Sequence, residues 1–166
     1  MNAPEIERNA SITLSAMLQH DAGGWHLLGV VPDPVAHAGP PERRLVREGD
    51  DSTIYQWRGL RLRLSPREAD DYIYNLTSRC PMLYLICKPG AHGEPVPLRV
   101  TADQDDGVAA IEVDEMLLQA PMPRTVIGWL QHYVETHWTP GPRKRSRGDK
   151  DRREKPGNER SRSERR

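Results

Sequence analysis

Hydrophobic and polar residues alternate most clearly between residues 60 and 64, where three leucines are separated by Arg61 and Arg63. This period of two is typical of a β-strand that buries one face and exposes the other. The next apolar positions are spaced as on one face of a helix: Ala69, Tyr72, Ile73 and Leu76. A continuous apolar run over residues 82–87 then indicates a strand that is covered on both faces. Residues 60–87 therefore predict a strand, a helix and a second strand.

The start of this helix carries a separate signal. Ser65 and Glu68 form an S-x-x-E capping box, in which each side chain would bond a backbone N–H at the helix start. Pro66 stands at the first helical position, where a missing N–H costs nothing.

In the strand before this helix, the apolar residues shift from odd to even positions. Tyr55 and Trp57 occupy odd positions, whereas Leu60, Leu62 and Leu64 occupy even ones. One extra residue near Gly59 would bring all five side chains to the same face, because a β-bulge shifts the alternation by one. A tight turn at the same place is the alternative.

Weaker patterns predict the remaining strands. Strands are expected over residues 25–31, 43–48, 54–64, 98–101 and 111–120, and the third of these is a long strand. Pro95 and Pro97 precede the fourth of these, and their missing N–H groups favour an edge strand there. The acidic stretch over residues 102–110 is expected to form a loop or a helical turn.

A last helix is expected to open at Pro123. It has a wide apolar face: Val126, Trp129, Leu130, Tyr133, Val134 and His137. The Pro-Gly-Pro sequence at residues 140–142 should end this helix.

Together the elements indicate an α+β domain with a mixed, largely antiparallel sheet of about five to six strands and two main helices. Periodicity is weak over residues 1–23, which we expect to be a weakly structured N-terminal segment. Residues 24–140 should form a single domain. Residues 141–166 contain nothing to bury and are expected to be a disordered basic tail.

The neutral total charge hides an asymmetry. The chain has 24 basic and 24 acidic residues, of which 12 basic and 5 acidic ones follow residue 142. The first 142 residues therefore hold 12 basic and 19 acidic residues, so an acidic domain precedes a basic tail. An acidic domain argues against a nucleic-acid groove on the folded part.

Compartment signals point to the cytoplasm. Two cysteines are too few for a disulfide framework, and Cys87 lies in an apolar run, so we expect it to be buried. The N-terminal residues lack a basic region followed by an apolar one, and no segment approaches the ~20 apolar residues of a membrane span.

Catalytic signatures are absent from the sequence, and no catalytic residue and no cofactor are predicted. The chain has no Gly-rich phosphate loop, no H-E-x-x-H and no C-x-x-C. Asp103, Asp105 and Asp106 resemble a calcium loop only in part, because Gly107 comes one place early and position twelve is Asp114. We expect a solvated acidic loop there.

Three sets of residues are weak candidates for binding. His132 and Glu135 are three apart in the last helix, a spacing that can place two metal ligands on one face, although no second pair completes a site. Arg61 and Arg63 could receive a phosphate or a carboxylate, but such a pair is more often simply the solvated side of a strand. In the tail, basic residues could bind an anionic partner: Arg143, Lys144 and Arg145.

Several segments resemble one bacterial family of unknown function. They are L-V-R-E-G-D at 45–50, L-R-L-R-L-S-P-R-E-A-D-D-Y-I-Y-N-L-T-S at 60–78, P-M-L-Y-L-I-C at 81–87, V-T-A-D at 100–103 and A-P-M-P at 120–123. Members are commonly encoded beside molybdenum-dependent formate dehydrogenase subunits and their accessory proteins, and some are labelled molybdopterin–guanine dinucleotide biosynthesis proteins. This chain departs from the family at residues 103–107. The resemblance supplies no catalytic residues.

The resemblance implies a non-catalytic accessory protein that supports assembly or maturation of the dehydrogenase by contacting one of its subunits or another maturation factor. One alternative is a protein of molybdenum-cofactor biosynthesis or transport that uses Arg61 and Arg63. Another alternative is a nucleic-acid or anionic-surface binder that acts through its basic tail.

Overall fold

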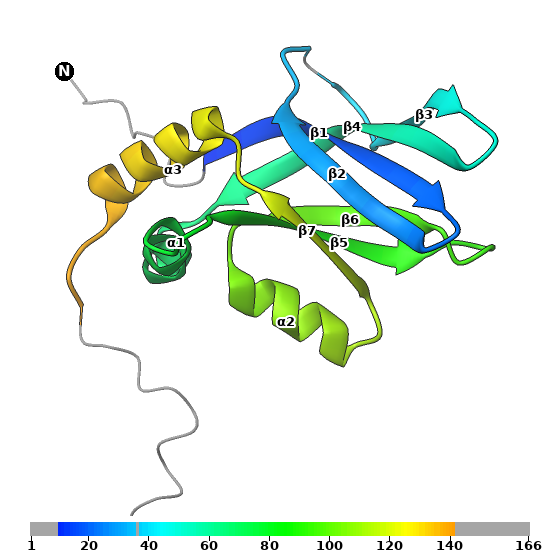
Figure 1. The fold of residues 1–166 in the computed structure, drawn as a ribbon. Helices are drawn as coiled ribbons and strands as arrows, with labels where there is room; N and C mark the ends of the chain where they lie inside the picture. Colours follow the sequence, from blue (N-terminus) through cyan, green and yellow to red (C-terminus); the bar gives the residue numbers. More distant parts are fainter. Residues whose placement is uncertain (1–9, 36, 142–166) are drawn as a thin grey trace, which may run out of the picture.

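The computed structural model describes residues 10–35 and 37–141. Within these two ranges, one mixed sheet of seven strands is accompanied by three α-helices and a short 3-10 helix (Figure 1). In chain order the elements are β1 (Ala10–Asp21), β2 (Gly24–Pro32), β3 (Glu42–Glu48), β4 (Ser52–Leu64), η1 (Pro66–Glu68), α1 (Ala69–Leu76), β5 (Met82–Pro89), β6 (Pro95–Thr101), α2 (Gln104–Glu112), β7 (Met116–Pro121) and α3 (Arg124–His137). The predicted α+β class with a mixed, largely antiparallel sheet is confirmed, with one more helix and at least one more strand than expected.

The sheet curls into a nearly closed barrel. Its strand order is β2-β1-β4-β6-β5-β7, and β3 pairs with β4 beside this path. Only β4 and β6 run parallel; the other pairs are antiparallel. The first and last strands of the order, β2 and β7, contact each other (Figure 1). Side chains on the concave face are thereby enclosed.

The N-terminal part of the chain is a central strand, not the weakly structured segment that was predicted for residues 1–23. β1 pairs with β2 on one side and with β4 on the other. Leu14, Ala16 and Leu18 alternate along it and are fully buried. The prediction was wrong for residues 10–21 because the small Ala16 and the polar Ser15 between the leucines dilute the apolar signal.

The predicted bulge in β4 is confirmed. Leu14 pairs with Leu60, and Ala16 pairs with Trp57, so three residue steps on β4 face two on β1. Gly59 supplies the positive φ of 76° that this irregularity requires, which an L side chain rarely adopts. The leucines of β4 point into the barrel as a result, and the residues between them point out.

β6 is an internal strand, and the prediction of an edge strand was wrong. It pairs with β5 along its length and with β4 only at Leu62 and Val100. The two prolines lie in the half of β6 that, within the described residues, pairs with β5 alone, so the start of the strand is not central, as the prolines indicated.

The acidic stretch forms the helix α2, and the following strand is shorter than predicted. Asp103 accepts a hydrogen bond from the backbone N of Asp105 at 2.9 Å and so caps the helix. α2 covers the outer face of β5 and β7, and a Cβ on Gly107 would lie 3.2 Å from Leu117 and 3.5 Å from Tyr84. A small residue at position 107 therefore permits this close approach.

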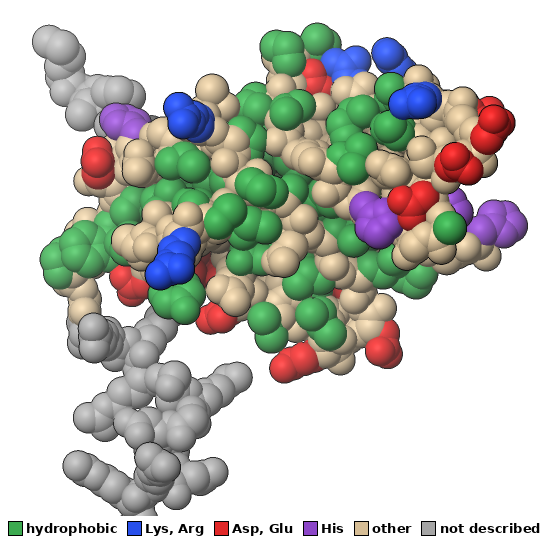
Figure 2. Space-filling view, viewed as in Figure 1, with side chains coloured by type: hydrophobic (Ala, Val, Ile, Leu, Met, Phe, Trp, Pro, Cys, Tyr) green, Lys and Arg blue, Asp and Glu red, His purple; other side chains and the backbone are tan. Residues whose placement is uncertain are grey.

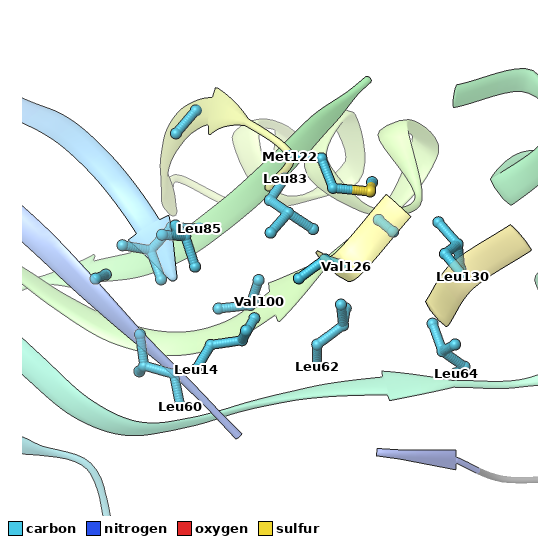
Figure 3. Packing of buried hydrophobic residues seen from close by; sticks show 14 of the residues in the cluster. Leu14, Leu60, Leu62, Leu64, Leu83, Leu85, Val100, Met122, Val126 and Leu130 are labelled. Atoms are coloured by element: carbon cyan, nitrogen blue, oxygen red, sulfur yellow. The ribbon is translucent and has the colours of Figure 1, made fainter. Parts of the chain in front are cut away.

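The core lies inside the barrel and under α3. Leucines from β1, β4 and β5 meet Val126 and Leu130 of α3, as Figure 3 shows. α3 packs beside α1, where the rings of Tyr72 and Tyr133 make an edge contact with centroids 6.3 Å apart (Figure 1). Cys87 is buried as predicted, and burial raises the pKa of its thiol to about 12.

Candidate functional site

The outward residues of β4 form the floor of an open groove. Because the bulge turns the leucines inward, Arg61 and Arg63 are exposed on the convex face. The groove has a volume of about 480 Å³. Its lining comes from β4, β6, η1, α2 and the connection between β2 and β3: Gly39, Pro41, Gly59, Arg61, Arg63, Glu68, Leu98, Arg99, Val100, Thr101 and Asp106.

One wall of the groove is held by an ion pair. Arg58 donates two hydrogen bonds to the carboxylate of Asp33, at 3.0 and 2.9 Å. The hydrogen bond from Arg58 lowers the pKa of Asp33 below its usual range. This bidentate pair fixes the start of the connection after β2 onto β4, one residue before the bulge. The sequence alone did not predict this ion pair between β4 and the segment after β2.

Of the three arginines that line the groove, Arg99 is already engaged. Its guanidinium donates to Asp106 at 2.8 and 3.3 Å and lies 3.8 Å from Glu115. The hydrogen bond to Asp106 raises the pKa of Arg99. Within the described part of the chain, Arg61 and Arg63 make no such contact. The groove therefore contains two arginines whose donors face solvent.

The acidic residue at the end of the groove is also engaged. Tyr72 donates its hydroxyl to the Glu68 carboxylate at 2.6 Å, and the same hydroxyl oxygen accepts from the backbone N of Ser65 at 3.1 Å. Burial, and then the bond to Glu68, raise the pKa of Tyr72. The predicted capping box is realised in a different form, since Tyr72 stands between Glu68 and the backbone of Ser65. Ser65 itself caps the backbone N of Arg67 at 3.4 Å.

A second depression, of about 420 Å³, is acidic. The carboxylates of Asp71, Asp103 and Asp105 offer oxygens within 4.8 Å of one another. Burial, followed by the charges of Asp71 and Glu68 among the raising effects, raises the pKa of Asp103 to about 6. Hard cations such as Ca²⁺ take oxygen ligands of this type, but the capping of α2 accounts for Asp103 and Asp105 without a cation. Of the residues compared with a calcium loop, Asp106 turns away to Arg99.

The pair His132 and Glu135 is exposed on α3. Within residues 10–35 and 37–141, the group of side chains that could share a metal ion does not include either residue. The helix buries its opposite side through Val126, Leu130 and Tyr133. The structure thus places this pair on a solvated helix face.

A further surface was missed from the sequence. All seven residues of β3 are exposed, and within the described residues this strand pairs with β4 alone. Leu45 and Val46 are 51% and 45% exposed. The Arg43 guanidinium lies 4.8 Å from the centre of the Tyr55 ring, a cation–π contact that fixes one end of the strand. The sequence E-R-R-L-V-R-E at residues 42–48 predicts a short strand but does not reveal that the strand is exposed on both faces.

Charged residues of both signs lie on the face of the molecule that Figure 2 shows. In Figure 2, acidic, basic and hydrophobic side chains are interspersed over the face in view. The basic residues predicted to bind a partner, Arg143, Lys144 and Arg145, lie outside the described residues, as does most of the predicted tail. No helix in the described ranges is long and apolar enough to cross a membrane.

A comparison with known protein families identifies the family of this chain. The model of a family described as "Protein of unknown function (DUF3305)" matches residues 19–147. This match covers most of the chain, which therefore belongs to that family. No curated protein matches the chain, and no solved structure matches it either.

Proposed function

We propose that this protein is a non-catalytic accessory factor that supports assembly or maturation of a molybdenum-dependent formate dehydrogenase through direct protein–protein contact. The observation that carries the proposal is the exposure of β3 on both faces and along one edge. We name the dehydrogenase as the partner because residues 45–50, 60–78 and 81–87 resemble the family described above.

The exposed strand is what a strand-adding partner requires. An unpaired strand edge presents a row of backbone N–H and C=O groups that a segment from another chain can pair with. Leu45 and Val46 add apolar surface that the fold of this chain leaves about half exposed. Burying such side chains contributes roughly 25 cal/mol for each Å² removed from water. β3 therefore offers both the hydrogen bonds and the apolar contact of a docking strand.

The charge of β3 favours an acidic partner segment. The strand has three arginines and two glutamates. Arg43 already covers Tyr55, but its charge remains available at the surface. A partner strand with carboxylates opposite Arg44 and Arg47 would gain cross-strand ion pairs. The expected partner surface is thus an apolar strand with flanking acidic residues.

The other two functions remain predictions. A cofactor carrier would need a phosphate site, for which Arg61 and Arg63 are the available residues. A nucleic-acid or anionic-surface binder would use residues 143–166, which lie outside the described ranges.

Affinity capture from cells that produce the dehydrogenase tests the proposal. The full chain, carrying an affinity tag, should recover the catalytic subunit or another maturation factor, identified by mass spectrometry. A strain that lacks this protein should lose dehydrogenase activity. Recovery of neither component, together with normal activity in the deletion strain, would contradict the proposal.

A further inference from the structure

We propose that the groove lined by Arg61 and Arg63 binds the phosphate group of a small phosphorylated organic ligand. The site is independent of the partner contact at β3, because it lies on the other half of β4 and is lined by different residues. Nothing in the fold requires two neighbouring arginines there, since both side chains are exposed.

The spacing of the two arginines suits one phosphate. They are two residues apart on one strand face, so their Cα atoms are separated by about 6.6 Å and their side chains leave the sheet in the same direction. A guanidinium forms a planar fork of donors that pairs with two oxygens at once. One arginine can satisfy a carboxylate, whereas a phosphate has enough oxygens to accept from both. The pair therefore favours phosphate over a single carboxylate.

The acidic residues near the site do not compete for these donors. Asp106 is bound to Arg99 through both carboxylate oxygens. Glu68 accepts the hydroxyl of Tyr72 at 2.6 Å. Each of these two carboxylates thus has a hydrogen-bond partner other than Arg61 or Arg63. The two unpaired guanidinium groups remain the binding charges.

The rest of the groove fits the organic part of such a ligand. Its volume of about 480 Å³ lies in the range of small-molecule sites. Leu98, which is 44% exposed, offers an apolar contact beside the arginines. The ligand expected is a phosphate ester of about nucleotide size.

Calorimetric titration of the full chain tests the site with three probes: AMP, adenosine and inorganic pyrophosphate. We expect saturable binding of AMP, and binding of adenosine that is weaker by about tenfold or more, since the phosphate contacts are lost. Replacing both arginines, Arg61→Gln with Arg63→Gln, should weaken AMP binding by about tenfold or more. The matched control, Arg79→Gln with Arg124→Gln, changes two exposed arginines that do not line the groove and should bind AMP as the unchanged protein does.

A second variant distinguishes the effect of the planar, bidentate guanidinium donors from the effect of positive charge alone. Arg61→Lys with Arg63→Lys keeps both charges and should bind AMP with intermediate affinity. Thermal unfolding checks that each variant is folded. The proposal is overturned by any of four results: no saturable AMP binding at millimolar concentration, equal binding of adenosine and AMP, binding of pyrophosphate without AMP, or unchanged AMP binding in the Arg61→Gln, Arg63→Gln variant. The last result would place any AMP binding outside this groove.

Discussion

The side-chain amide of Asn75 donates a hydrogen bond to the backbone carbonyl of Ala102 at 2.8 Å, across 27 residues of sequence. The same NH₂ group donates to the carbonyl of Met82 at 2.8 Å, and its Oδ1 accepts from the backbone N of Met82 at 2.9 Å. Asn75 is 4% exposed. One side chain thus joins α1 to the start of β5 and to the residue that follows β6.

Asn75→Ala should lower the free energy of unfolding by about 3 kcal/mol, because it leaves buried backbone groups of Met82 and Ala102 unpaired. Urea denaturation measures this change. Thr77→Ala in the same helix end is the matched control, since it removes an exposed hydroxyl that bonds the Ile73 carbonyl at 2.9 Å. That control should cost less than about 1 kcal/mol. Equal losses in the two variants would show that the buried amide is not a structural link.

Gly59→Ala should destabilise the protein by about 1–3 kcal/mol, because the Cβ of alanine makes the positive φ at the bulge sterically unfavourable. The added Cβ would also clash with the ring of His37, which would have to move. Gly128→Ala is a matched control in the exposed face of α3, where a Cβ meets nothing within 4 Å. That change should stabilise by about 0.5–1 kcal/mol through helix propensity. Thermal or urea unfolding measures both changes. A change in the free energy of unfolding that has the same sign in both variants would contradict the role of Gly59 in the bulge.

Asp103 should make stability depend on pH. Its pKa of about 6 in the folded state is above the ordinary value of 3.8, so the folded protein holds this proton more tightly than the unfolded chain. The stabilisation is complete below pH ~4 and is lost as the pH rises through ~6. Asp103→Asn keeps an acceptor for the cap and removes the titration.

Relative to the unchanged protein, the Asp103→Asn variant should gain about 2 kcal/mol of stability between pH 4 and pH 8. Urea denaturation at several pH values measures the difference. A difference that stays constant across this range would show that Asp103 titrates normally in the folded protein.

Local signals in the sequence were sufficient for much of the fold. The alternation at Leu60–Leu64, the apolar run at Met82–Cys87 and the parity change near Gly59 each reflect a strong steric or burial rule, and the structure has all three features. β1 and α2 were harder to predict. β1 owes its central place to partners on both sides, which its own residues do not reveal.

The candidate sites were predictable only in part. Arg61 and Arg63 were identified from the alternation, which places them outside the barrel. That Arg99 and Asp106 pair beside them depends on the packing of α2 against β6, which no local pattern shows. The sequence also did not predict the link that Tyr72 makes between Ser65 and Glu68, because the capping-box pattern predicts that Glu68 bonds the backbone directly. The exposure of β3 follows from its position beyond β4 and not from its composition.

Capture of the dehydrogenase components by two matched variants tests the role of β3 most directly. Leu45→Ser with Val46→Ser removes apolar surface from β3, where these residues are 51% and 45% exposed. Val108→Ser with Ile111→Ser removes similarly exposed surface, 47% and 57%, from α2. We predict that the β3 variant loses capture of the catalytic subunit or maturation factor by about tenfold or more, whereas the α2 variant retains it. Undiminished capture by a folded β3 variant would contradict the account.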